Sequence, residues 1–209
     1  MTYIENIYFC LASPILLAVL CLRKEGRRIL AFILAGMTVC LLSAYISTYL
    51  AGVAGIDQAE AAWEIVPVVE EIMKLLPLAL FILVFEPEKK VAITGALYVA
   101  VGFTTFENVC YLTSYGSAGL LRVLIRGFGT GALHVMCGMI VSVGLYYLWD
   151  QAWLRTVGAF TLLCFVITLH AIFNILVNQP GAVFWIGSAI PISCIFAYLA
   201  LLRKQIDLT

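Results

Sequence analysis

Long apolar stretches alternate with short polar ones along almost the whole chain. A membrane-spanning helix needs about 20 mostly apolar residues, and by this measure the pattern predicts about seven spanning helices. They fall at roughly 3–22, 29–52, 64–85, 91–112, 122–149, 156–178 and 182–202. The segments between them are short, and each contains charged residues, Gly or Pro. We therefore expect an all-α fold, a polytopic membrane helical bundle that forms one domain over residues 1–209.

The composition supports a membrane protein. Hydrophobic residues make up 64% of the chain and charged residues only 11%, which is too apolar for a soluble core with a charged surface. The net charge is zero, so we expect the lipid bilayer and no nucleic acid as a partner. The seven cysteines stand singly in apolar runs without a CxxC pair. We interpret them as packing or lipid-facing residues, and not as disulfides or zinc ligands.

Basic residues lie on one side of the predicted bundle. The start "MTYIENIYFC" has no Lys or Arg, so we expect the first apolar segment to be retained and not cleaved as a secretory signal. The loops at 51–61, 113–120 and 178–181 also have none. Cytoplasmic loops are enriched in Lys and Arg, so we predict a multi-pass protein of the cell membrane with its N-terminus outside and its C-terminus in the cytoplasm. Nine of the twelve basic residues then face the cytoplasm: Arg23, Lys24, Arg27, Arg28, Lys89, Lys90, Arg155, Arg203 and Lys204. The other three are Arg122, at a helix end, and Lys74 and Arg126, inside predicted spans.

Several polar residues lie inside the predicted spans. They are Glu70, Glu71, Lys74, Glu107, Asn108, Arg126, His134, His170 and Asn174. Each charged residue at a helix centre costs about 2.5–3.5 kcal/mol on insertion scales. The span at 64–85 carries three of them, so we expect it to be stable only when neighbouring helices solvate those groups.

The depths of these residues converge. At about 1.5 Å per residue, Glu70, Glu107 and His170 lie about 8–10 Å from the outer ends of their helices. Asn174 lies about 5 Å in and His134 about 18 Å in, by the same rise. Spacing of i, i+4 places Glu70 with Lys74, and His170 with Asn174, on shared helix faces. We therefore predict a polar pocket in the outer half of the membrane.

Each residue alone has a simpler explanation. An intramembrane His or Asn commonly makes one hydrogen bond between helices. Glu70 and Lys74 form a possible self-neutralising pair, and Arg126 can snorkel outward or neutralise Glu107. Three carboxylates, two imidazoles, two amides and two cations at similar depths nevertheless exceed what packing requires, which favours a functional pocket.

Three kinds of chemistry suit this set of side chains. A carboxylate can take the proton of a hydrolytic water while His or Asn donors stabilise the oxyanion. Alternatively, Glu and His from separate helices can bind zinc, for which the candidate ligands are Glu70, Glu107, His134 and His170. Ion or proton transport is the third possibility, although we would then expect polar groups in the inner half as well. A protein that only binds membrane peptides also remains possible.

Four motifs, within a core of about 64–178, carry a resemblance to a known family. They are "EEIMK" (70–74), "GFTTFENVCY" (102–111), "RGFGTGALHVMCG" (126–138) and "HAIFN" (170–174). Their order and spacing resemble the PrsW family of intramembrane proteases, relatives of the CAAX prenyl protease and bacteriocin-processing (CPBP) superfamily. The resemblance implies cleavage of a single-span, membrane-anchored substrate, as in site-1 cleavage of an anti-sigma factor on the extracytoplasmic side.

The resemblance also implies roles for individual residues. Glu70 or Glu71 is the general base, with Glu70 preferred, and His170 with Asn174 supplies oxyanion donors. In the CAAX branch the second motif ends in His, where this chain has Glu107. Whether that carboxylate shares a proton with Glu70, orients His134 or helps to bind a metal is left open. Supporting roles fall to Lys74, Asn108 and Arg126, and zinc is possible as a cofactor without being required.

Overall fold

The computed structural model describes residues 3–115 and 119–206, except for the side chains of residues 114, 115, 122 and 201–206. The side chains of Arg122, Arg203 and Lys204, and residues 116–118 of the predicted loop at 113–120, therefore lie outside the described part of the chain. Within that part the protein is all-helical, with eight helices and no strand.

Seven of these helices correspond to the predicted apolar segments. They are α1 (Ile4–Cys21), α2 (Lys24–Ala54), α4 (Val66–Phe85), α5 (Lys89–Tyr115), α6 (Leu120–Leu148), α7 (Ala152–Val177) and α8 (Ala182–Ile206). The segments 23–28 and 150–155 were expected to be loops but are largely helical. Their Arg, Lys, Glu, Ala and Leu residues favour helix even where they lie beyond the apolar stretch.

By length and composition, five helices in the described part of the chain are able to cross a membrane. These are α1, α2, residues 123–148 of α6, α7, and residues 182–200 of α8. The two other long helices, α4 and α5, contain 20 and 27 residues. They carry four of the charged residues that the sequence places inside spans: Glu70, Glu71, Lys74 and Glu107.

The short helix α3 (Gln58–Glu64) corrects part of the predicted loop at 51–61. Gly55, with φ of 70°, ends α2, and Asp57 caps α3 by accepting a hydrogen bond from the Glu60 N–H at 2.8 Å. Only Ile65 separates α3 from α4, in whose first turn Pro67 lies. Seven residues are too few for a helical apolar period to be recognised, so the sequence pattern did not predict α3.

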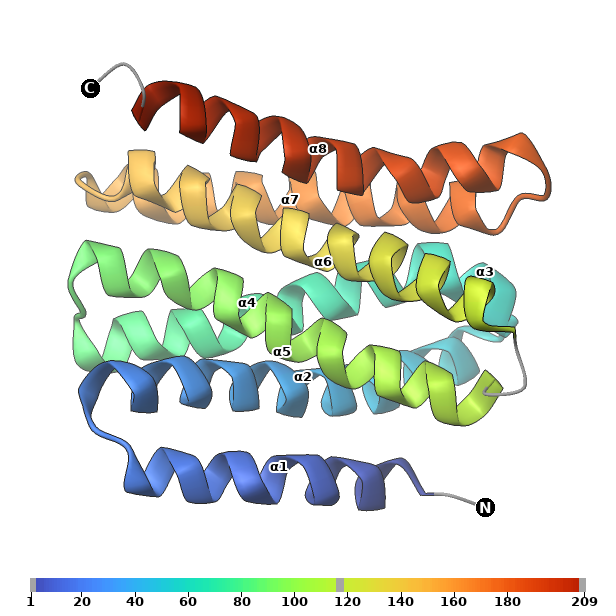
Figure 1. The fold of residues 1–209 in the computed structure, drawn as a ribbon, viewed down its shortest axis with the longest axis horizontal. Coiled ribbons are helices and arrows are strands. Elements are labelled where there is room, and N and C mark those ends of the chain that lie inside the picture. Colours follow the sequence, from blue (N-terminus) through green and yellow to red (C-terminus); the bar gives the residue numbers. More distant parts are fainter. Residues whose placement is uncertain (1–2, 116–118, 207–209) are drawn as a thin grey trace.

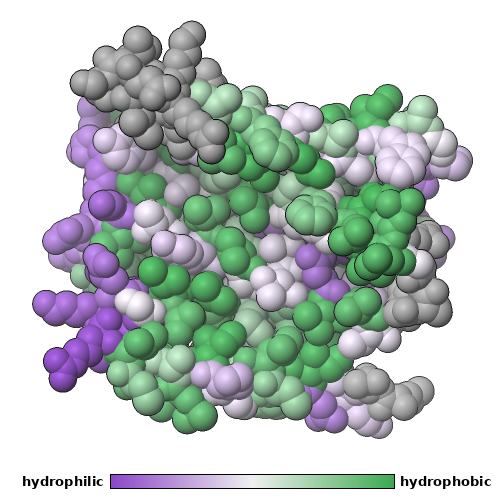
Figure 2. Space-filling model, in the orientation of Figure 1, coloured by the Kyte–Doolittle hydropathy of each residue, from purple (hydrophilic) through white to green (hydrophobic). Residues whose placement is uncertain are grey.

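The long helices lie side by side with alternating directions (Figure 1). The α1–α2, α4–α5 and α6–α7 turns meet at one end of the bundle, shown on the left in Figure 1. We call it the basic end, because it holds Arg23, Lys24, Arg27, Arg28, Lys89, Lys90 and Arg155. Strongly hydrophilic side chains gather at this end of the surface, whereas its middle is largely hydrophobic (Figure 2).

The most extensive helix contact is between α2 and α5. It includes a core cluster in which Phe103 and Phe106 are fully buried. Glycines on both helices permit the close approach: a Cβ at Gly36 would overlap the Val99 carbonyl oxygen, and a Cβ at Gly102 would overlap that of Ile33. This contact fixes α5, and with it the polar residues that α5 presents to α4 and α6.

We predict that Gly36→Ala and Gly102→Ala each destabilise the fold by about 1–3 kcal/mol, because the added methyl group forces the two backbones apart. Unfolding in detergent micelles, followed by circular dichroism, measures this effect. Gly52→Ala in α2 is the matched control, because nothing lies within 4 Å of its added Cβ. If all three variants unfold alike, the close contact of α2 with α5 is not a determinant of stability.

Candidate active site

Polar side chains from four helices converge inside the bundle. Each of α4, α5, α6 and α7 contributes to one connected group of hydrogen bonds and ion pairs. Its members are Glu71, Lys74, Glu107, Arg126, His134 and His170. Glu70 lies against both histidines. The convergence predicted from depth alone is therefore found for all of the charged residues and histidines.

One half of the group joins α5 to α6. Arg126 donates from Nη2 to Glu107 Oε1 at 2.7 Å and from Nη1 to Thr130 Oγ1 at 2.7 Å. The other oxygen of Glu107, Oε2, lies 2.7 Å from His134 Nε2. The Arg126 guanidinium also lies 4.8 Å from the centre of the Tyr111 ring. Glu107 thus bridges a cation and an imidazole, and Thr130 orients that cation.

The other half joins α4 to α6 and α7. Lys74 donates from Nζ to Glu71 Oε1 at 2.6 Å, and its Nζ lies 2.9 Å from His134 Nδ1. Glu71 Oε1 also lies 2.8 Å from His170 Nδ1. The Phe103 ring, whose centre is 4.9 Å from Lys74 Nζ, closes one side of the group. A single chain of contacts therefore runs from Arg126 on α6 to His170 on α7.

These contacts assign a tautomer to each histidine. An ammonium group only donates hydrogen bonds and an ionised carboxylate only accepts them. Lys74 therefore makes His134 Nδ1 an acceptor, so that the neutral ring carries its proton on Nε2 and donates it to Glu107. Glu71 makes His170 Nδ1 a donor, which leaves the lone pair of the neutral ring on Nε2. At Nε2, His134 thus presents an N–H group, whereas His170 presents a lone pair.

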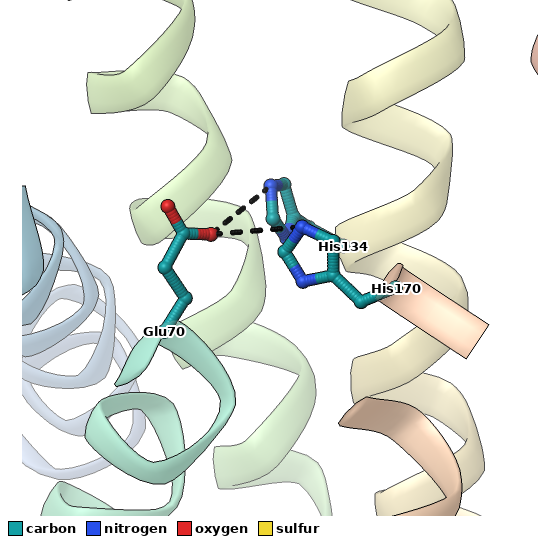
Figure 3. A group of neighbouring side chains, drawn as sticks. All are labelled: Glu70, His134 and His170. Carbon is teal, nitrogen blue, oxygen red and sulfur yellow. Dashed lines mark ion pairs between the residues drawn. The ribbon is translucent and has the colours of Figure 1, made fainter. Parts of the chain in front are cut away.

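Glu70 is the third carboxylate beside the histidines, and it lies outside this chain of hydrogen bonds. Its Oε2 atom lies 4.0 Å from His134 Nε2 and 3.9 Å from His170 Nε2, and it faces both rings (Figure 3). That oxygen is buried and has no hydrogen-bond partner among the described residues. An unpaired buried polar atom is costly, so this position is suited to a water molecule or a cation.

The charge balance of the group leads to the same conclusion. Arg126 pairs with Glu107, and Lys74 pairs with Glu71. Glu70 is therefore the carboxylate of the group for which no cationic partner is found among the described residues. When ionised at this buried position, it needs a counter-charge, because a buried charge without one is far more expensive than a paired one.

The same three residues fit a metal ion. Donor atoms of Glu70, His134 and His170 all lie within 4.8 Å of one another. Two ligands of one tetrahedral zinc are about 3.4 Å apart, given bonds of about 2.0–2.1 Å. Glu70 and His170 present free lone pairs, and the Glu71 contact to His170 is the outer support that metal-binding histidines typically have. His134 fits after it gives up the Nε2 proton that it donates to Glu107.

The two predicted asparagines lie outside this connected group of hydrogen bonds among the described residues. Asn174 donates from Nδ2 to the carbonyl oxygen of Ala62 in α3 at 2.8 Å, so its amide holds α7 to α3. Asn108 lies against Gly131 of α6, and its buried Oδ1 has no hydrogen-bond partner among the described residues. Sequence reasoning did not identify Ala62, because it acts through its backbone and belongs to the helix that was not predicted.

Comparison with known families adds an independent finding. The model of the PrsW family intramembrane metalloprotease matches residues 25–202, which include every residue of this group. No curated protein and no solved structure matches the chain. Because the family match covers most of the chain, this protein belongs to the PrsW family of intramembrane metalloproteases and is a membrane-embedded hydrolase.

Proposed function

We propose that the chain is an endopeptidase that hydrolyses a peptide bond of a single-span, membrane-anchored protein, with a water molecule activated between Glu70, His134 and His170. The observation that carries this proposal is the buried Glu70 oxygen, which has no hydrogen-bond partner among the described residues and faces two histidines of fixed tautomer. A carboxylate in this position has an acceptor atom available for the proton of a water molecule.

The surrounding residues supply the other roles. Glu70 takes the proton of the attacking water, and His170 Nε2 presents a second lone pair to the same position. His134 Nε2 carries the N–H that can turn from Glu107 toward the developing oxyanion. Glu71 and Lys74 hold the two imidazoles in place. An oxyanion role for Asn174 requires its amide to leave the Ala62 carbonyl that it now binds.

We propose zinc as the metal of this site. Glu70, His134 and His170 would hold it. A bound zinc ion lowers the pKa of its water to about 7 and polarises the scissile carbonyl. The donor set supports this choice, because nitrogen and carboxylate oxygen are the usual ligands of catalytic zinc.

We further propose the placement of the chain in the membrane. The basic end lies in the cytoplasm, α4 and α5 cross with the other five helices, and the N-terminus is outside. The chain is then a multi-pass protein of the cell membrane, and its active site opens toward the extracytoplasmic side. The placement suits site-1 cleavage of a substrate of the anti-sigma-factor type, and we infer kinship with the CPBP superfamily from the order of the four motifs.

Transport and simple peptide binding are supported less well. On the basic side of the polar group, a small cavity lies between α4, α5, α6 and α7. Its walls are apolar residues such as Leu78, Ala100 and Val166, and its only charged residues are Glu71 and Lys74. An ion that continued toward the cytoplasm would meet this apolar lining, which favours a catalytic pocket over a transport path.

We predict that Glu70→Gln lowers cleavage of a co-expressed single-span substrate by about 10²–10⁴-fold, because the acceptor for the water's proton is lost. Glu71→Ala should also abolish cleavage, since His170 loses the acceptor that orients it. Immunoblots of substrate length measure both effects, and Glu64→Gln, an exposed residue of α3, is the control. Normal cleavage by both variants would remove the protease assignment from this group of residues.

Metal content separates the two ways of activating water. We expect about one zinc ion per purified chain, lost in His170→Ala because three protein ligands are the usual minimum for a catalytic site. Mass spectrometry of the metal and cleavage assays before and after chelation measure this. If a chain freed of metal keeps full activity, zinc does not activate the water. Glu70 then acts as the base without a metal.

Site-directed labelling tests the orientation. In a variant without the exposed cysteines Cys10, Cys21, Cys164 and Cys194, we expect Gln179→Cys to react with a membrane-impermeant maleimide in intact cells. Glu88→Cys, at the basic end, should react only after permeabilisation. The reverse pattern would place the active site on the cytoplasmic side.

A further inference from the structure

A recess connects the polar group with the end of the bundle opposite the basic end. It lies between the ends of α5, α6, α7 and α8. Arg126, Thr130, Asn178 and Ser188 line it together with aromatic and aliphatic side chains. Since Arg126 binds Glu107 directly, the recess ends at the polar group.

Exposure within the polar group increases toward this recess. The side chains of His134 and His170 are 0% and 3% exposed, whereas those of Glu107 and Arg126 are 21% and 28% exposed. A substrate that reaches the histidines from outside the bundle therefore passes Arg126 and Glu107.

A second hollow lies directly beside the recess on the apolar surface between α6 and α8. The walls of this groove include Leu124, Phe128, Trp185 and Ala189. Its exposed lining is almost wholly apolar. The groove and the recess share two residues, Ile125 and Ser188, so the two hollows meet along one rim.

We propose that the α6–α8 groove binds the transmembrane helix of the substrate, and that the chain of the substrate crosses the Ile125–Ser188 rim into the recess. This inference rests on the proposed function and adds to it the surface through which the substrate arrives. A ligand that meets an apolar, lipid-facing groove within a membrane must itself be apolar. A single-span substrate has such a helix and a polar segment next to it.

The chemistry of the recess suits that polar segment. A peptide bond in a helix is shielded by its neighbouring turns, so the segment must be extended before water can attack it. Extension frees backbone N–H and C=O groups, which need partners inside a membrane protein. The Thr130 hydroxyl, the Asn178 amide and the Ser188 hydroxyl line the recess and offer both donors and acceptors.

The other cavity beside the polar group lacks these properties. The cavity on the basic side is walled by apolar side chains, and its Glu71 and Lys74 are already paired with each other. An extended backbone placed there would leave its polar groups without partners. The α6–α8 side is therefore the better approach for the substrate.

Photo-crosslinking tests the groove directly. The probe is a single-span reporter with a Leu/Ala span of about 20 residues and an outer juxtamembrane segment selected for cleavage by the wild-type chain. Benzoylphenylalanine replaces Phe128, Trp185 or Tyr49 in the Glu70→Gln background, which keeps the reporter intact. Tyr49 on α2 is the matched control, since it is an aromatic residue exposed to 70%, as Phe128 is to 68%.

A blocking variant gives a second measurement in the active chain. Ala189→Trp fills the groove, and Ala44→Trp places the same side chain on an exposed site of α2. We expect Ala189→Trp to lower reporter cleavage about tenfold, which corresponds to a loss of about 1.4 kcal/mol of binding. A peptide with only the cleaved segment should be cut at the wild-type rate, because it enters the recess without docking a helix.

The outcomes separate this inference from the proposed function. Stronger crosslinking at Phe128 and Trp185 than at Tyr49, with selective loss of reporter cleavage in Ala189→Trp, supports the groove. Equal crosslinking at all three positions, or equal cleavage by the two Trp variants, overturns it while the protease assignment stands. If the wild-type chain cuts neither a reporter nor a peptide, the proposed function is overturned. The groove then has no role as a substrate site.

Discussion

The fold depends on one electrostatic constraint: five charged side chains inside an apolar helical bundle must solvate one another. Arg126 with Glu107, and Lys74 with Glu71, form pairs that two imidazoles link into one chain. Such groups are tolerated in a bilayer only when each finds a partner. Four helices therefore have to meet at one level, and Glu70 is the carboxylate for which the described residues provide no cationic partner.

The rest of the bundle keeps this arrangement rigid. Glycines at the α2–α5 contact bring the backbones together and fix the helix that carries Glu107. On the other side, Asn174 binds α7 to α3, one turn of helix from His170. Removing one partner of a buried ion pair leaves an uncompensated charge and costs about 3–5 kcal/mol. Preorganised partners consequently matter for both stability and chemistry, because they hold the imidazoles in fixed tautomers before a substrate arrives.

The sequence predicted the helices and the convergence of their polar residues, but not the pairing among them. Apolar length identified the seven long segments, and charges that are expensive in lipid identified the group. The short helix α3 lacked a detectable period, so its contact with Asn174 was not foreseen. Glu70 and Glu71 are adjacent in the sequence. The rotation of α4 against α6 and α7 places Glu71 in contact with His170 and leaves Glu70 Oε2 without a hydrogen-bond partner among the described residues. That rotation depends on packing between helices that are distant in sequence.

The two possible ways of activating water differ by one proton at His134. While Lys74 donates to Nδ1, the ring keeps a proton on Nε2 and shares it with Glu107. A metal ion held by Glu70, His134 and His170 would require His134 to give up that proton, and it would supply the positive charge that Glu70 lacks. Without a metal, a proton taken from water by Glu70 would move the negative charge from the carboxylate to the hydroxide. Both proposed mechanisms therefore use the carboxylate that has no cationic partner in the group, and they differ in whether His134 keeps the Nε2 proton that it shares with Glu107.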